Sequence, residues 1–116
     1  MKTYEEIQER FGYMLDLRMG QLECGEGWHD LIWASLEKME KHIPEEGWKI
    51  PIIKEKFGAL NIQFHRGTME LRDISQDAEM LSQTICECCG VPAKTVKRDG
   101  WDYTLCNTCL KGDKND

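Results

Sequence analysis

The sequence predicts an α+β fold of about three helices and a β-hairpin, closed at the C-terminus by a zinc ribbon. Three observations support this prediction. Apolar residues recur at helical spacing in three segments, another segment alternates between apolar and polar residues, and two Cys-x-x-Cys pairs lie near the C-terminus. At 116 residues the chain is expected to form one domain with a small core, so a bound metal ion would add substantially to its stability.

The first two helices are predicted from a capping motif and an apolar stripe. Thr3 and Glu6 have the spacing of a capping box, which predicts a helix over residues 4–18. The glycine-rich segment 20–27 is expected to be a loop, and a second helix is expected over about residues 28–43. The apolar stripe of this second helix consists of Trp28, Leu31, Ile32, Leu36, Met39 and Ile43.

A β-hairpin and a third helix follow. Residues 60–65 alternate between apolar and polar side chains, as a half-buried strand does. The preceding run 48–56 is apolar and β-branched, and Pro51 restricts it to the edge of a sheet. Gly58 lies between the two runs, which indicates a hairpin turn. Apolar residues at helical spacing predict the third helix over about residues 70–85.

These elements suggest a simple domain organisation. The α+β domain is expected over residues 1–84, and the zinc ribbon over residues 85–111 is expected to continue directly from the last helix. Residues 112–116 are expected to form a short disordered tail.

Four of the six cysteines have the spacing of a zinc-ribbon site. Cys86 and Cys89 form the first Cys-x-x-Cys pair, and Cys106 and Cys109 form the second. Two residues between thiolates let a tight turn direct both sulfurs at one ion, and the Asp-Gly sequence at residues 99–100 predicts the hairpin that brings the second pair across. Four thiolates complete the coordination of one Zn²⁺ and leave no position for water, so the predicted zinc is structural.

The sequence leaves open other metals and another choice of cysteine ligands. An iron site is one, because thiolate ligands suit both metals. A shifted register could use Cys88 in place of Cys86 or Cys89, but Cys88 and Cys89 are adjacent, which disfavours that pairing. Cys88 is therefore expected to be a thiol on the knuckle that binds no metal, and Cys24 is expected to be a packed thiol.

No pattern in the sequence indicates catalysis. The three histidines do not form a helix-borne metal pair, and no serine has the sequence context of a nucleophile. His29 is expected at the surface. Because the metal site is closed and no catalytic constellation is recognisable, we expect a protein that is not an enzyme.

Charge and hydropathy restrict the partners and the location. The net charge is −6, and a filled four-cysteine site would make the protein more acidic by about two charges, which disfavours nucleic acid as a partner. No apolar run is long enough to span a bilayer or to form the core of a signal peptide. We therefore expect a cytoplasmic protein that does not contact membranes.

Aromatic and basic residues are the candidates for contacting a partner. Trp33 lies on the flank of the second-helix stripe and is expected to be the more exposed tryptophan, whereas Trp101 is expected to pack over the ribbon. The basic residues near the hairpin and the ribbon could contact a phosphate backbone, or they could simply offset the thiolates and nearby acids. The candidate set is Trp33, Lys54, Lys56, Arg66, Lys97, Arg98 and Trp101.

Three segments together resemble small uncharacterised proteins encoded by phages and prophages that have a C-terminal four-cysteine zinc ribbon: GEGWHDLIWASLEKMEKHIP, IKEKFGALNIQFH and CECCG…YTLCNTC. The likeness covers about residues 25–110, and KEKFGAL is its more specific element. It implies an accessory protein made in the cytoplasm of an infected host cell, and it supplies no catalytic residue.

The leading hypothesis is therefore a non-enzymatic zinc-ribbon protein that binds a host protein. The host protein would be, for example, a defence or nucleic-acid-metabolism factor, and binding could inhibit it. The alternatives are a nucleic-acid-binding zinc-ribbon protein and a protein that sequesters a small ligand. The oligomeric state is left open.

Overall fold

The computed structural model describes residues 1–112, and it confirms the predicted α+β class. Helices α1 (Tyr4–Phe11), α2 (His29–Met39) and α3 (Met69–Ser82) accompany the hairpin of strands β1 (Ile52–Lys56) and β2 (Ala59–Gln63). A second hairpin, β3 (Lys94–Arg98) and β4 (Trp101–Leu105), leads into the short helix α4 (Asn107–Gly112). Gly112 thus ends a helix, and the rest of the predicted tail lies outside the described residues.

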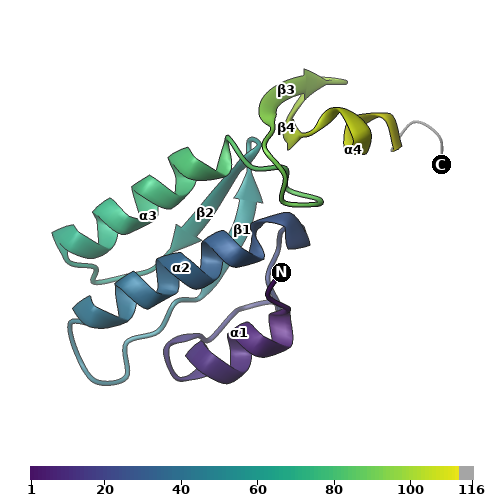
Figure 1. Cartoon of the computed structure of the whole chain (residues 1–116). Helices are drawn as coiled ribbons and strands as arrows, with labels where there is room; N and C mark the ends of the chain where they lie inside the picture. Colours follow the sequence, from purple (N-terminus) through teal and green to yellow (C-terminus); the bar gives the residue numbers. More distant parts are fainter. Residues whose placement is uncertain (113–116) are drawn as a thin grey trace.

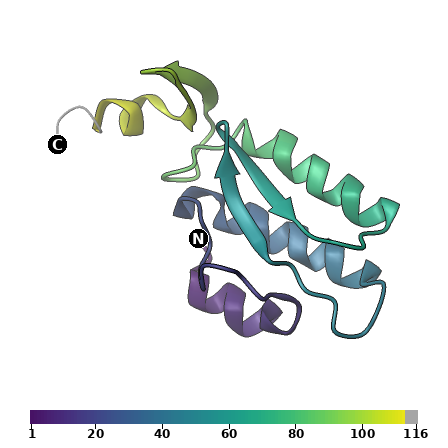
Figure 2. The same ribbon diagram turned by 180° about the vertical axis from the view of Figure 1, so that it is seen from behind.

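The helices and the first hairpin enclose the core. Figures 1 and 2 show α2 and α3 side by side against one face of the β1–β2 hairpin, with the β3–β4 hairpin and α4 at one end. The core side chains come from α1, α2, α3, the β1–β2 hairpin and the segments between them. The fully buried ones are Ile7, Phe11, Met14, Trp28, Ile32, Leu36, Met39, Ile50, Ile53, Leu60 and Leu71. None of the described helices is long and apolar enough to cross a membrane.

Helix boundaries differ from the predicted ones at several ends. Thr3 and Glu6 form the predicted capping box, but α1 ends at Phe11 and continues only as a 3₁₀ turn over Gly12–Met14. The chain then becomes extended because its backbone bonds to the segment before β1 instead of to itself: the amide of Asp16 donates to the carbonyl of Ile50 at 3.1 Å. The predicted helix 4–18 is therefore too long at its C-terminal end.

The second and third predicted helices are also shorter in the structure. Short 3₁₀ turns at Glu26–Trp28 and Glu40–His42 flank α2. The first and last residues of the predicted 28–43 helix therefore lie in or beside these turns and not in the α-helix. Helix α3 ends at Ser82 because residue 85 pairs with Pro92 in an isolated antiparallel bridge, which requires an extended backbone.

Both edges of the β1–β2 hairpin are covered. Beside β1, the amide of Glu23 donates to the carbonyl of Ile53 at 2.9 Å, so the predicted loop 20–27 partly acts as a third strand. Beside β2, two serines of α3 take the place of a neighbouring strand. Ser82 Oγ accepts from the amide of Leu60 at 2.8 Å, and Ser75 Oγ donates to the carbonyl of Ile62 at 2.9 Å. Groups that would otherwise be unpaired at an edge are thereby satisfied.

Candidate metal centre

Four sulfur atoms meet between the end of α3 and the start of α4. The Sγ atoms of Cys86, Cys89, Cys106 and Cys109 all lie within 4.8 Å of one another. The Sγ atoms of Cys89 and Cys106 are 3.7 Å apart. Four sulfurs around one tetrahedral ion, with bonds of about 2.3 Å, lie about 3.8 Å from each other. The cluster therefore has the size and the donor set of a site for one thiophilic ion.

The first pair lies on a tight turn that begins just after α3. The amide of Cys86 donates to the carbonyl of Val91 at 2.7 Å, and the amide of Gly90 donates to the carbonyl of Cys86 at 2.9 Å. Gly90 has a φ of 84°, the conformation that the sequence predicts for a glycine after the second cysteine. Cys86 is fully buried, so the first pair begins inside the protein and not at its surface.

The second pair follows the β3–β4 hairpin. The strands pair in antiparallel register from Lys94 with Leu105 to Arg98 with Trp101, and the turn between them is the predicted Asp99–Gly100. Cys106 lies directly after β4, and Cys109 lies in α4. The amide of Cys109 points at the Cys106 sulfur from 3.4 Å, as amides do in metal-binding knuckles.

The electrostatics of the cluster favour a bound cation. Burial acts to raise the pKa of Cys86, but backbone amides of Cys106, Cys89 and Cys88 outweigh it and lower the pKa to about 6. The pKa of Cys109 is raised instead, first by its contact with Cys106 and then by Cys89. Four adjacent sulfurs therefore resist simultaneous ionisation, and a divalent cation would remove that conflict.

The glycine-rich loop before α2 supports the first knuckle. The amide of Gly27 donates to the carbonyl of Glu87 at 3.0 Å, and Trp28 Nε1 donates to the carbonyl of Ile85 at 2.8 Å. A Cβ atom on Gly27 would lie 2.0 Å from the Cys86 carbonyl oxygen, and one on Gly25 would lie 2.1 Å from that of Glu87. The two glycines of the GEGW segment are therefore needed for this close approach.

The β3–β4 hairpin contacts the rest of the protein through the turn of the first hairpin. Thr104 is fully buried, and its Oγ1 donates to the carbonyl of Gly58 at 2.6 Å. Thr95 lies across from Thr104, with the two hydroxyl oxygens 2.8 Å apart. The amide of Thr104 in turn donates to the carboxylate of Glu87 at 2.9 Å. These contacts connect the β1–β2 turn, the ribbon hairpin and the first knuckle.

The cysteines outside the cluster have different environments. Cys88 is exposed and lies on the knuckle, and the four sulfurs that meet are those of the unshifted register. Cys24 packs against the core, and burial raises its pKa to about 12. Cys24 is therefore a packed thiol, as the sequence predicts.

The two aromatic candidates for partner binding differ in exposure. Trp33 packs edge-on against Phe11 of α1, with ring centroids 5.1 Å apart, and is partly buried. Trp101 is 66% exposed, so the expectation that Trp33 is the more exposed tryptophan and that Trp101 packs over the ribbon is wrong. Trp101 begins β4 directly after the Asp99–Gly100 turn and pairs with Arg98 at the end of the hairpin.

The basic candidates are partly engaged within the protein. Arg66 pairs with Glu45 at 3.2 Å, and Lys97 pairs with Asp102 at 3.1 Å. The Arg98 guanidinium lies 5.0 Å from the ring centroid of Tyr103 and also donates to the Leu110 carbonyl. By contrast, no ion pair joins the ammonium of either Lys54 or Lys56 to a carboxylate within residues 1–112.

Sequence reasoning assigned His29 wrongly and overlooked Phe57. His29 is only 5% exposed, because its Nδ1 lies 2.8 Å from the Lys2 carbonyl and the N-terminal segment covers it. Phe57 is 71% exposed at the tip of the β1–β2 hairpin. The exposure of Phe57 could have been inferred from the sequence, because Phe57 lies directly before Gly58, where a hairpin turn is predicted.

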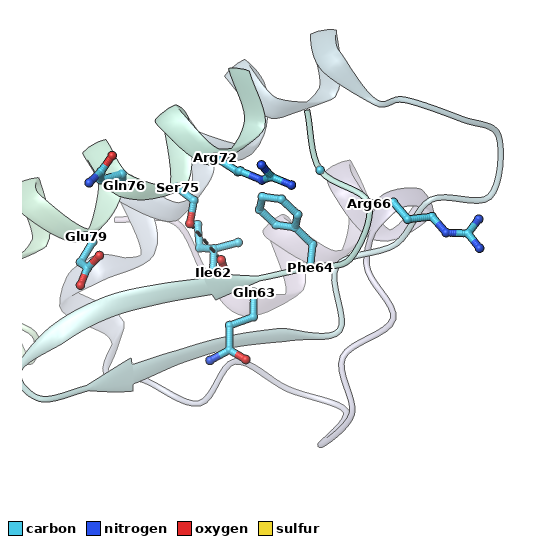
Figure 3. Close-up of a pocket in the computed structure, with 9 residues that line it drawn as sticks. Ile62, Gln63, Phe64, Arg66, Arg72, Ser75, Gln76 and Glu79 are labelled. Carbon is cyan, nitrogen blue, oxygen red and sulfur yellow. Dashed lines mark hydrogen bonds between the residues drawn. The ribbon is translucent and has the colours of Figure 1, made fainter. Parts of the chain in front are cut away.

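A separate cavity lies between β2 and α3. It has a volume of about 570 Å³ and is lined by Ile62, Gln63, Phe64, Arg66, Gly67, Arg72, Ser75, Gln76 and Glu79. Figure 3 shows the side chains of Arg72 and Phe64 next to each other, between Glu79 at one end and Arg66 at the other. The Ser75 hydroxyl is committed to the carbonyl of Ile62 and is not positioned as a nucleophile.

No protein-family model, curated protein or solved structure matches this chain.

Proposed function

We propose that this chain is a non-enzymatic binding protein whose C-terminal ribbon holds one structural Zn²⁺ and whose partner is another protein. The observation that supports this most directly is the meeting of four cysteine sulfurs within 4.8 Å. Four thiolates saturate a tetrahedral ion, so the metal would shape the ribbon and would not activate water or substrate. On the basis of the sequence resemblance to phage proteins, we propose a partner in a host cell and a location in the host cytoplasm.

A protein partner is favoured by what the ribbon region exposes. Phe57 and Trp101 are large aromatic side chains at the ends of two hairpins, and both are mostly exposed. Aromatic side chains of this kind dominate the binding energy of protein interfaces when a partner buries them. Both hairpins are tied together by the Thr104–Gly58 contact, so a partner would meet a surface of defined shape.

Nucleic acid is the second candidate, and the exposed Trp101 is the observation that favours it, because a base can stack on an indole ring. The charges oppose it. Lys97 is neutralised by Asp102, the Arg98 guanidinium is occupied by Tyr103 and Leu110, and the whole chain has a net charge of −6. Phosphate binding needs accessible cations, so this surface offers weak affinity at physiological salt.

The test has two parts. Metal analysis of protein purified with both zinc and iron present should give one zinc per chain, and iron or no metal would contradict the proposal. The zinc-loaded protein is then tested for a stoichiometric complex in bacterial lysate, beside a metal-stripped sample and a titration with short single-stranded DNA and RNA. Salt-sensitive oligonucleotide binding at physiological ionic strength, without a protein complex, would favour the second candidate.

A further inference from the structure

The two hairpins close with the same turn but with different residues. Phe57 and Gly58 have φ values of 55° and 80°, and Asp99 and Gly100 have φ values of 53° and 83°. Two-residue turns with both φ values positive favour Asn, Asp or Gly at the first position, because other side chains clash with the backbone there. The ribbon hairpin follows this rule with Asp99, whereas the first hairpin places a phenylalanine at the strained position.

Burial does not offset that strain. The Phe57 ring is 71% exposed, and the cation nearest to it is the neighbouring Lys56, whose Nζ lies 5.9 Å from the ring centroid. An exposed phenylalanine in a left-handed conformation stabilises the fold neither through a favoured backbone conformation nor through burial of apolar surface. The contribution of this residue to the stability of the free chain is therefore unfavourable, and a role in binding accounts for it.

The turn that holds Phe57 is rigid. The Gly58 amide donates to the Glu55 carboxylate at 2.8 Å, and the Gly58 carbonyl accepts from Thr104 at 2.6 Å. A Cβ atom at position 58 would lie 3.2 Å from the carbonyl carbon of Asp102 and 3.3 Å from a Thr95 methyl group. The ribbon therefore holds the backbone of the turn, so that burying the ring in a partner would cost little additional backbone entropy.

The surroundings of the ring have the layout of a small protein interface. A cavity of about 300 Å³ lies beside Phe57 and is lined by Lys56, Phe57, Ala59, Asn61, Glu79 and Gln83. Two amide side chains and a carboxylate thus lie next to the ring along this cavity, and they could form part of the polar rim of an interface. Lys54 and Lys56 make no ion pair in the part of the chain that the structure describes, which leaves their ammonium groups for carboxylates of a partner.

We propose that Phe57 is the anchor of a protein interface: the ring enters an apolar pocket on a partner protein, and carboxylates at the rim of that pocket pair with Lys56 and Lys54. This inference rests on the proposed protein-binding function and names the surface that performs it. A nucleic acid fits this surface less well than isolated carboxylates placed beside Lys56 and Lys54, because Glu79 lines the same cavity and Glu55 lies at the turn, where a continuous phosphate backbone would be repelled.

The experiment uses the matched turns of the two hairpins. Phe57→Asn removes the ring and supplies a residue that favours the left-handed conformation, and Asp99→Asn places the same residue at the equivalent position of the ribbon hairpin without removing a ring. A photoreactive benzoylphenylalanine is placed at position 57 or at position 99 of the zinc-loaded full chain. The protein cross-linked in bacterial lysate is identified together with its cross-linked peptide, purified, and titrated with the wild type, both asparagine variants and Lys56→Glu.

We expect a cross-link from position 57 to a pocket that contains acidic residues, and a dissociation constant at least about tenfold higher for Phe57→Asn. Lys56→Glu should weaken binding in a salt-dependent way, and Asp99→Asn should leave it unchanged. Phe57→Asn should unfold at the same temperature as the wild type or a higher one, since strain is relieved and the lost ring is mostly exposed.

Three results would overturn the inference. The first is unchanged affinity of Phe57→Asn for the purified partner, which would leave the proposed function standing with a different contact surface. The second is a cross-link from position 57 only to nucleic acid or to a second copy of this chain. The third is a marked fall in the unfolding temperature of Phe57→Asn, which would show that the ring supports the fold. The proposed function itself fails if the protein forms no complex and if benzoylphenylalanine at positions 33 and 101 also gives no cross-linked protein.

Discussion

Gly27→Ala tests whether the loop before α2 and the metal knuckle form one packed unit. Gly27 does not have a left-handed backbone, so alanine is strained there only by its contacts. Its Cβ would lie 2.0 Å from the carbonyl oxygen of Cys86 and 2.7 Å from the amide nitrogen of Gly90. All of these neighbours are backbone atoms of the knuckle, which cannot rotate away as a flexible side chain could.

The size of the effect follows from this geometry. The loop and the knuckle would have to separate by about 1.4 Å to restore ordinary contact, which would break the buried hydrogen bond from the Gly27 amide to the Glu87 carbonyl. Overpacking and the loss of one such bond together cost about 2–5 kcal/mol. For a chain of this length, that lowers the unfolding temperature by roughly 10–20 °C.

The assay is thermal unfolding of the zinc-loaded protein by circular dichroism, together with the rate of zinc transfer to a chromogenic chelator. We expect Gly27→Ala to unfold at a lower temperature and to release zinc faster. Gly20→Ala is the matched control, because a Cβ there meets nothing within 4 Å and its cost of about 1 kcal/mol comes only from the positive φ of 69°. Unchanged stability and zinc release in Gly27→Ala would refute the tight contact between loop and knuckle.

Four other predictions concern single side chains. Cys106→Ser should reduce the zinc content from one per chain to none, whereas Cys88→Ser should leave it unchanged; elemental analysis measures both. Ser82→Ala should lower the free energy of unfolding by about 1–3 kcal/mol in urea titrations, because the buried amide of Leu60 loses its acceptor. Burial raises the pKa of Cys24 from 9.0 to about 12, so the fold favours the neutral thiol, and stability should fall as pH rises from 9 towards 12. Cys24→Ala should remove that part of the pH dependence.

The elements predicted from local patterns are present, and the errors lie at their ends. The capping box at Thr3 and the Asp99–Gly100 turn depend on neighbours in sequence, so the sequence suffices to find them. The premature end of α1 depends on hydrogen bonds to the segment before β1, which is distant along the chain. Likewise, the role of Ser82 at the edge of β2 could not be inferred from α3 alone.

The candidate metal site was predictable because its spacing encodes its geometry, and all four predicted cysteines meet in the structure. The packing around the site was not predictable. Gly25 and Gly27 suggested only a loop, although their lack of side chains is what lets the knuckle approach. The exposure of Trp101 likewise depends on which face of the β3–β4 hairpin packs against the rest of the protein, and no local pattern specifies that.

The unequal support of the two thiol pairs has a consequence for how the ion is acquired. Cys86 is fixed by core packing and by the loop before α2, whereas Cys106 and Cys109 depend on a small hairpin and a six-residue helix. We expect the nascent chain to present half of the ligand set as soon as the helices assemble. The ion would then bind first to Cys86 and Cys89, and Cys106 and Cys109 would complete its coordination. Exchange of the ion should begin with release of Cys106 and Cys109.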